Sequence, residues 1–196
     1  MIQEKLSGKT VWGFRDPLSI LEYSYHTDTF SEEECKSIIE IDGEYKKSNT
    51  IRETVGKRDS SNLWLYPEGN EWIYRRLVDC ITAVNSSIYN YKLVGLETLQ
   101  LTKYEVGGFY SEHADMDDQD TMYDSQRKLS FSVQLSHESD YSGGDLVFPV
   151  GDNLTVCKKD VGLLISFPSY KVHRVEKVTS GTRYSLVGWV NGPSFV

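Results

Sequence analysis

The segment Tyr110-Ser-Glu-His-Ala-Asp115 contains a histidine and an aspartate separated by one residue. In an extended chain, residues i and i+2 point to the same side, so the His113 imidazole and the Asp115 carboxylate can bind one metal ion together. The pair alone indicates little, because a surface histidine beside an acidic loop gives the same pattern. The metal interpretation therefore depends on a further ligand elsewhere in the chain.

That ligand is His173, one of only four histidines, which follows an apolar run that ends near Phe167. Two histidines and one carboxylate form the facial triad of non-haem Fe(II), which leaves the opposite face of the ion open. We therefore expect His113, Asp115 and His173 to be the metal ligands and the catalytic centre.

An arginine opens the alternating segment that lies ten residues after His173. Alternation places four residues of this segment on one face: Arg183, Ser185, Val187 and Trp189. A cation that faces a protein interior is costly unless it is paired, and arginine is suited to binding a carboxylate bidentately. The dicarboxylate 2-oxoglutarate would chelate the ion through its keto-acid end and reach Arg183 with its far carboxylate.

The first half of the chain predicts helices and one strand. Ser31 as N-cap and Glu34 at the capping-box position begin a helix that should run to about Asp42, where Gly43 ends it. Residues 46–60 form a polar stretch that we interpret as a loop, and 62–66 is a predicted strand. Apolar residues at helical spacing predict a second helix over 68–89.

After residue 91, short alternating runs separated by turn residues predict strands at 98–105, 128–135, 145–149, 162–167 and 183–190. Helices followed by strands indicate an α+β chain, in which N-terminal helices pack on one sheet of a jelly roll. We divide it into a support region, 1–95, and a core, 96–196. Within 128–135, apolar side chains share one face and Ser130, Ser132 and Gln134 share the other. The polar face either encloses a site or meets solvent, and the pattern leaves both open.

Four stretches resemble, in order and spacing, the 2-oxoglutarate/Fe(II) dioxygenases of the prolyl 4-hydroxylase-like group, especially the bacterial PKHD-type hydroxylases. They are Leu101–Asp115 (LTKYEVGGFYSEHAD), Arg127–Ser136 (RKLSFSVQLS), Tyr141–Leu146 (YSGGDL) and His173–Ser185 (HRVEKVTSGTRYS). The resemblance spans 99–193, about half of the chain, and extends more loosely to 58–64 and the helix after it.

This resemblance implies a double-stranded β-helix fold that uses Fe(II), 2-oxoglutarate and O2, with ascorbate as a reductant. It implies that Arg183, Tyr104, Gln134 and Ser185 bind the co-substrate, and that three residues contact the prime substrate: Tyr110, Arg58 and Trp189. The expected reaction is hydroxylation of a C–H bond in a prolyl residue of a peptide or protein, with decarboxylation of 2-oxoglutarate to succinate. Collagen-type members usually anchor the co-substrate with lysine, so the arginine favours PKHD-type and oxygen-sensing relatives.

Two other functions remain to be weighed. The same chemistry could act on another amino acid, a small molecule or a modified nucleobase. A jelly-roll binding module that is not an enzyme is the alternative from another class. The intact set of two histidines, one aspartate and one interior arginine argues against the module, because such a module has no use for a cation beside an open metal site.

Bulk composition narrows the partners and the compartment. The net charge of -8 argues against nucleic acid or an anionic membrane as the main partner, and leaves a peptide, a protein or a small molecule as the substrate. No apolar run approaches the ~20 residues that span a bilayer, and the start lacks a signal-peptide core. Three widely spaced cysteines suit a reducing compartment, so we expect a cytoplasmic protein. Its oligomeric state is left open.

Two polar segments, 49–60 and 116–126, flank the expected site and contain few large apolar residues. Segments that bury little apolar surface gain little from staying fixed. We expect them to be mobile without substrate and to close over it when it binds.

Overall fold

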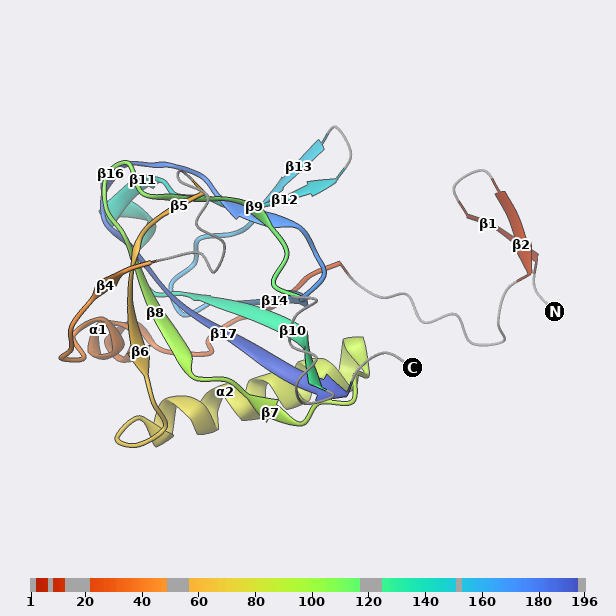
Figure 1. Cartoon of the computed structure of the whole chain (residues 1–196), viewed down its shortest axis with the longest axis horizontal. Coiled ribbons are helices and arrows are strands. Elements are labelled where there is room, and N and C mark those ends of the chain that lie inside the picture. Colours follow the sequence, from red (N-terminus) through yellow and green to blue (C-terminus); the bar gives the residue numbers. More distant parts are fainter. Residues whose placement is uncertain are drawn as a thin grey trace.

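Two antiparallel sheets face each other in the computed structural model, which describes residues 3–6, 9–12, 22–48, 57–116, 125–150 and 153–193 (Figure 1). The larger sheet has the order β3 (Ser24–His26), β14 (Leu164–Pro168), β10 (Ser125–Gln134), β17 (Arg183–Pro193), β8 (Leu99–Tyr104), β6 (Ser61–Leu65) and β4 (Lys46–Lys47), with β7 (Gly95–Leu96) also pairing with β17. The smaller sheet has the order β13 (Asn153–Val156), β12 (Leu146–Val150), β15 (His173–Val175), β9 (Phe109–His113) and β5 (Arg58–Asp59).

Two further strand pairs complete the described sheets. They are β11 (Tyr141–Gly143) with β16 (Val178–Gly181), and the hairpin of β1 (Gln3–Leu6) with β2 (Lys9–Trp12). The large sheet takes strands from both halves of the chain, because β3, β4 and β6 join strands that come much later in the sequence. The helical elements are α1 (Glu32–Ile39), α2 (Glu71–Val84), the π-helical turn η1 (Asn85–Tyr89) and the 3-10 turn η3 (Glu138–Asp140).

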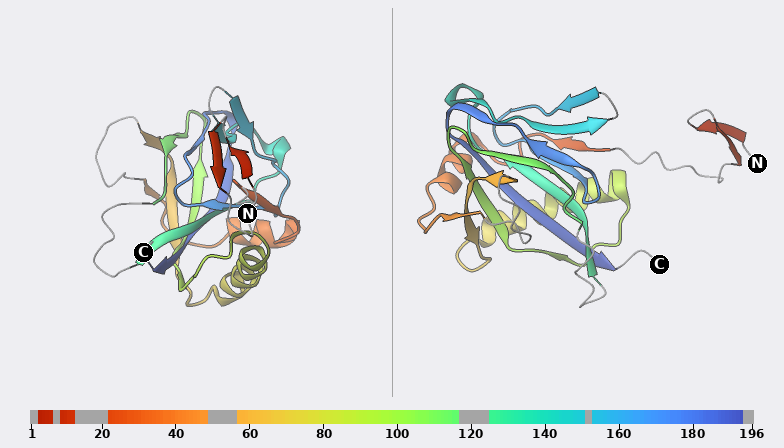
Figure 2. Two further views of the ribbon diagram at one scale, coloured as in Figure 1. Left: turned by 90° about the vertical axis from the view of Figure 1, so that its right-hand side faces the viewer. Right: turned by 45° about the horizontal axis from the view of Figure 1, so that its top comes forward.

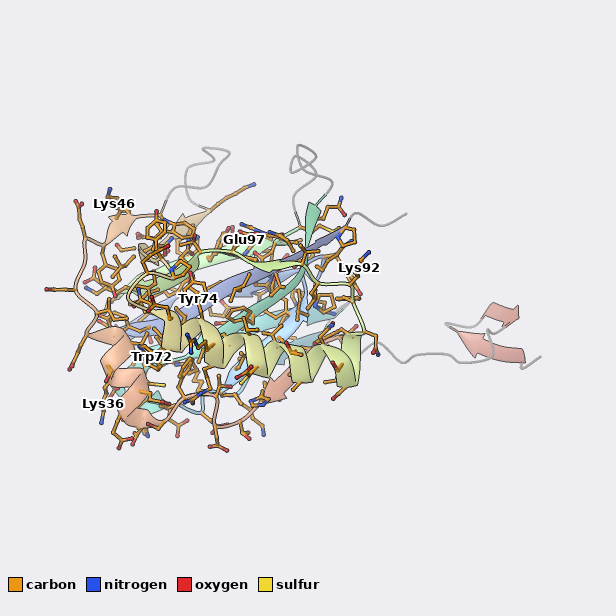
Figure 3. All side chains as sticks on the ribbon, turned by 90° about the horizontal axis from the view of Figure 1, so that it is seen from below. Lys36, Lys46, Trp72, Tyr74, Lys92 and Glu97 are labelled. Atoms are coloured by element: carbon orange, nitrogen blue, oxygen red, sulfur yellow. The ribbon has the colours of Figure 1, made fainter. Side chains whose placement is uncertain are left out.

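The helices lie against the outer face of the larger sheet (Figure 2). Figure 3 shows α2 along this face, with Tyr74 between the helix and the strands. The Tyr74 hydroxyl donates to the carbonyl oxygen of Leu65 at 2.6 Å and accepts from the backbone N–H of Leu99 at 3.0 Å, which ties α2 to β6 and β8. Apolar side chains of helix and sheet form one core, which includes Ile73, Leu77, Leu99, Leu101, Leu129, Phe131 and Val133.

The opposite face of the larger sheet is polar and buried. Gln100, Thr102, Ser130, Ser132 and Gln134 all have exposed fractions of 7% or less. The polar face therefore does not meet solvent, and the enclosed arrangement is the correct one of the two that the pattern allowed. The predicted jelly roll with helices packed on one sheet is confirmed.

The first helix begins as predicted but ends earlier. Ser31 accepts from the backbone N–H of Glu34 and the Glu34 carboxylate accepts from that of Ser31, which completes the capping box. The helix stops at Ile39 with Glu40 as its C-cap, so the predicted end near Asp42 was wrong. Gly43 serves another purpose, because a β-carbon there would lie 2.5 Å from a methyl carbon of Leu63.

Several strands lie where the sequence pattern predicted none. Strands β4 and β5 lie within the stretch interpreted as a loop, and β9 and β15 are too short to show an alternating pattern. The predicted helix over 68–89 is the α-helix α2 followed by the π-helical turn η1. Of the two segments expected to close over the substrate, 49–56 and 117–124 lie outside the described residues. Neither described helix is long and apolar enough to cross a membrane.

Candidate metal and co-substrate site

The two histidines of the expected triad come from neighbouring strands of the smaller sheet. His113 on β9 is directly opposite His173 on β15, and Tyr110 on β9 is opposite Val175. Three residues of β9 therefore span the same distance as two residues of β15, which is a β-bulge. The bulge breaks the alternation of β9, so Tyr110 and His113 face the same side and their rings stack with centroids 3.6 Å apart.

Asp115 completes a compact group of three ligand atoms. Its Oδ1 lies 3.6 Å from Nε2 of His113, and its Oδ2 lies 3.7 Å from Nε2 of His173. Ligand atoms of the three residues lie within 4.8 Å of one another, the only such group among the described residues. Donors at this spacing can share one metal ion.

Hydrogen bonds fix which nitrogen of each histidine faces the group. Nδ1 of His113 lies 2.8 Å from the carbonyl oxygen of Ser111, and Nδ1 of His173 lies 3.0 Å from that of Lys171. A carbonyl oxygen can only accept, so each Nδ1 carries the proton and each Nε2 presents a lone pair. Backbone carbonyls orient metal-binding histidines in this way.

The electrostatics keep the donors in their ligating forms. Burial and the facing His173 lower the pKa of His113 to about 4, so its imidazole is neutral at neutral pH. Burial opposes the charged form of Asp115, but attraction to the two facing imidazoles and hydrogen bonds with Ser130 and Trp189 outweigh burial and hold the pKa of its carboxyl below the usual range. A neutral imidazole and an ionised carboxylate are the forms that bind a metal.

The backbone around Asp115 is held by the loop after β14. The N–H groups of Asp115 and Met116 both donate to the carbonyl oxygen of Ser169, at 2.9 and 3.0 Å. Ser169 is itself fixed, because its N–H donates to the carbonyl oxygen of Lys128 and its hydroxyl lies 2.9 Å from that of Ser130. The carboxylate is thereby tied to the same sheet that carries the polar inner face.

Arg183 lines the same cavity as the three ligands, a space of about 410 Å³ between the two sheets. It is opposite Tyr104 on the neighbouring strand, and its guanidinium carbon lies 5.5 Å from the centre of the Tyr104 ring. The side chain is 3% exposed, and its Nη1 donates a long bond of 3.4 Å to the hydroxyl of Ser185. Among the described residues, no carboxylate forms an ion pair with it. A buried guanidinium without a counter-ion is costly, so the site suits an anionic ligand.

Gln134, expected to bind the co-substrate, does not line this cavity. Its side-chain amide donates to the carbonyl oxygen of Ser136 and to the hydroxyl of Tyr141, at 3.0 and 2.8 Å. A β-carbon on Gly144 would lie 3.0 Å from Cδ of Arg183 and 3.3 Å from the Tyr141 ring. Gln134 therefore holds a tyrosine that packs near the arginine.

All three residues expected to contact the prime substrate line the cavity. Arg58 on β5 is opposite Tyr110, and its guanidinium carbon lies 4.6 Å from the centre of the Tyr110 ring. Trp189 is 7% exposed, and its indole N–H helps to lower the pKa of the Asp115 carboxyl. Burial raises the pKa of Tyr110, so its hydroxyl stays protonated.

Six other polar or aromatic residues line the cavity without having been predicted as site residues: Trp64, Gln100, Arg127, Phe131, Ser132 and Phe167. Gln100 could have been found, because it lies on the polar face of the predicted strand at 98–105. Arg127 forms two hydrogen bonds to the Glu97 carboxylate, at 2.8 and 2.6 Å. Its guanidinium carbon lies 4.1 Å from the centre of the Trp189 ring. No local pattern in the sequence pairs Arg127 with Glu97.

Comparison with known proteins assigns the fold and site to a class. The sequence profile of the 2OG-Fe(II) oxygenase superfamily matches residues 99–191. A PKHD-type hydroxylase of Idiomarina loihiensis is 30% identical over 176 residues, which cover 87% of this chain and 77% of the relative. The chain therefore belongs to the 2OG-Fe(II) oxygenase superfamily, and within it to the PKHD-type hydroxylases. A PKHD-type hydroxylase of Acaryochloris marina is 38% identical over 95 residues, which cover 48% of this chain but only 42% of that relative.

Solved structures show the same fold. A viral collagen prolyl hydroxylase of Paramecium bursaria Chlorella virus-1 superposes with a TM-score of 0.68 at 22% identity, covering 88% of this chain and 97% of the other. A prolyl-4-hydroxylase of Pseudomonas putida superposes with a TM-score of 0.67 at 21% identity, covering 88% and 94%. The core is accordingly a double-stranded β-helix.

Proposed function

We propose that this chain is an Fe(II)- and 2-oxoglutarate-dependent dioxygenase that hydroxylates a C–H bond and converts 2-oxoglutarate to succinate. One observation carries the proposal: a group of two histidines and one aspartate shares a cavity with a buried arginine, Arg183, that has no counter-ion within the described part of the chain. A structural metal site would need no such cation, and a simple anion site would need no such donor group.

The donor set fits Fe(II). Two imidazoles and one carboxylate suit this ion, and three protein ligands leave coordination positions for other molecules. When bound, Fe(II) with 2-oxoglutarate and O2 supplies the oxidant that transfers one oxygen atom to the substrate. Ascorbate would serve as the reductant that keeps the iron ferrous.

The remaining cavity residues bind, orient and shield. Arg183 binds the far carboxylate of 2-oxoglutarate, with the hydroxyls of Tyr104 and Ser185 beside it. Tyr110 stacks on His113 and also contacts the Arg58 guanidinium, while Trp189 supplies an apolar wall. A largely enclosed site of this kind limits reaction of the oxidant with water.

The prime substrate we propose is a prolyl residue of a peptide or protein. The support is associational, because relatives of the same fold are named as prolyl hydroxylases. The same site could act on another amino acid, a small molecule or a nucleobase. The three cysteines are free and buried, which agrees with a cytoplasmic location.

A screen of prolyl peptides and metabolites tests the proposal. The enzyme is supplied with Fe(II), 2-oxoglutarate and ascorbate in air, succinate is quantified, and products are examined for a mass increase of about 16 Da, the mass of one oxygen atom. Succinate that appears only with Fe(II) supports the chemistry, and a +16 Da product identifies the substrate. A protein that binds metal but forms no succinate with or without candidate substrates would be a binding module.

A further inference from the structure

Arg58 is one of three arginines that line the active-site cavity, and it lies over the ring of Tyr110. Pairing of β5 with β9 sets Arg58 directly opposite Tyr110, so the two side chains share a face. The guanidinium carbon lies 4.6 Å from the centre of the Tyr110 ring, and that ring stacks on His113 with centroids 3.6 Å apart. Arg58 and the metal ligand His113 thus contact the same aromatic ring.

The guanidinium is held in place by neutral acceptors. Its Nε donates to the hydroxyl of Ser60 at 2.7 Å, and its Nη2 donates to the side-chain oxygens of Asn62 and Gln100 at 3.0 and 2.9 Å. These three bonds fix the orientation of the group without neutralising its charge. Its hydrogen bond with the Tyr110 hydroxyl, which counteracts the effect of burial on the pKa of that hydroxyl, is also with a neutral partner. A guanidinium held rigidly in this way is pre-organised to bind a planar anion.

The charge of Arg58 has no counter-ion among the described residues. The adjacent carboxylate, Asp59, lies 3.5 Å from the ammonium of Lys47 instead. The three arginines that line the cavity differ in this respect. Arg127 is paired with Glu97 and Arg183 suits 2-oxoglutarate, whereas no carboxylate of the described residues pairs with Arg58.

The loaded site would therefore carry one positive charge too many. The ion and the two unpaired arginines contribute four positive charges, while Asp115 and the dicarboxylate contribute three negative ones. A half-buried site with a net charge favours a ligand that cancels it. A role in folding alone would not require the charge, because neutral side chains could make the bonds to Ser60, Asn62 and Gln100.

We propose that the prime substrate carries a carboxylate and that Arg58 binds it, which makes Arg58 a determinant of substrate specificity. This inference rests on the proposed function, since it concerns the substrate of the same cavity. The carboxylate could be the α-carboxylate of a free amino acid or of a chain end, or the side chain of an acidic residue beside the hydroxylated one. Both sources present the same planar anion to the guanidinium.

Matched ligand pairs test the proposal. The probes are L-proline and L-prolinamide, N-acetyl-Ala-Pro as acid and as amide, and capped peptides with an internal Asp-Pro or Asn-Pro step. Binding is measured by calorimetry to the enzyme loaded with Fe(II) and 2-oxoglutarate without O2, for the wild type, Arg58→Gln and Arg58→Lys. Arg76→Met is the control, because Arg76 forms its ion pair with Glu34 at the surface.

We expect at least one carboxylate to bind about 30-fold or more tightly than its amide partner, as expected for a partly buried charge pair. Arg58→Gln should remove this difference without weakening the amide, Arg58→Lys should restore part of it, and Arg76→Met should preserve it. A response confined to the first two pairs assigns an α-carboxylate, and one confined to the Asp-Pro pair assigns an acidic side chain.

The proposal is overturned if no carboxylate binds better than its amide, or if Arg58→Gln weakens both members of a pair equally. Fe(II)-dependent succinate formation without a prime substrate is measured in parallel on the same variants. Its absence from the wild type would contradict the proposed function, whereas its presence with no preference for carboxylates would contradict only the assignment of Arg58.

Discussion

Replacing Arg183 by methionine should separate affinity for 2-oxoglutarate from stability of the fold. Methionine keeps much of the length of the side chain but leaves the far carboxylate of 2-oxoglutarate without a partner at a position only 3% exposed. Loss of one partner of a buried charge pair costs about 2–5 kcal/mol. The KM for 2-oxoglutarate in succinate formation should therefore rise by a factor that lies between about 30 and several thousand.

The same substitution should not destabilise the ligand-free protein, although it weakens binding of 2-oxoglutarate. Arg183 has no carboxylate partner among the described residues, so methionine removes an uncompensated buried charge. The Tm of the ligand-free variant should equal or exceed that of the wild type. Saturation of the wild type at 100 times Kd should add about 2.7 kcal/mol, or roughly 5–10 °C, under anaerobic conditions with Fe(II). The same ligand concentration should add less than about 1 kcal/mol to Arg183→Met.

Arg76→Met serves as the matched control, since it removes an arginine whose ion pair with Glu34 lies at the surface. Its KM and its ligand-induced shift in Tm should match those of the wild type. An unchanged KM in Arg183→Met, or a large loss of ligand-free stability with a normal response to ligand, would refute the assignment.

Other substitutions and reagents test separate parts of the structure. Gly144→Ala should raise the KM for 2-oxoglutarate, because Gly144 has a φ of 62° and the added carbon would press on Cδ of Arg183. An unchanged KM in the succinate assay would argue against this contact. Ser31→Ala should lower the free energy of unfolding in urea by about 1 kcal/mol with KM unchanged, through loss of the α1 cap. Burial raises the pKa of Cys35 to about 11 and of Cys157 to about 12, so both thiols should be protonated at pH 8 and react with a disulfide reagent only after unfolding. Rapid labelling of the native protein would show that these thiols are accessible.

The sequence was sufficient to predict the direction of candidate site side chains where that direction follows from a simple local rule. The i, i+2 spacing of His113 and Asp115 and the alternation after Arg183 both describe how the side chains point in the structure. The capping box at Ser31 is a local feature as well, and it formed as predicted. Such features depend on residues within one or two turns of each other.

Features that depend on pairing between distant strands could not be predicted in the same way. The bulge that turns Tyr110 and His113 to one side exists only because β9 pairs with β15. Strict alternation would have placed their side chains on opposite faces. The position of Arg58 over Tyr110 and the pair of Arg127 with Glu97 likewise depend on contacts across the fold. Gln134 was placed on the correct face, but no local signal shows that it bonds to Tyr141 rather than lining the cavity.

Succinate formation by the wild type and by Asp115→Ala, with and without Fe(II), is the most direct test of the central claim. Asp115 is the only carboxylate in the group of three ligands. Its loss should lower both Fe(II) affinity and turnover by orders of magnitude, while the protein remains folded. The account predicts Fe(II)-dependent succinate from the wild type and almost none from the variant at the same iron concentration. Near-equal succinate formation by the two proteins would contradict it, because the iron would then be held elsewhere.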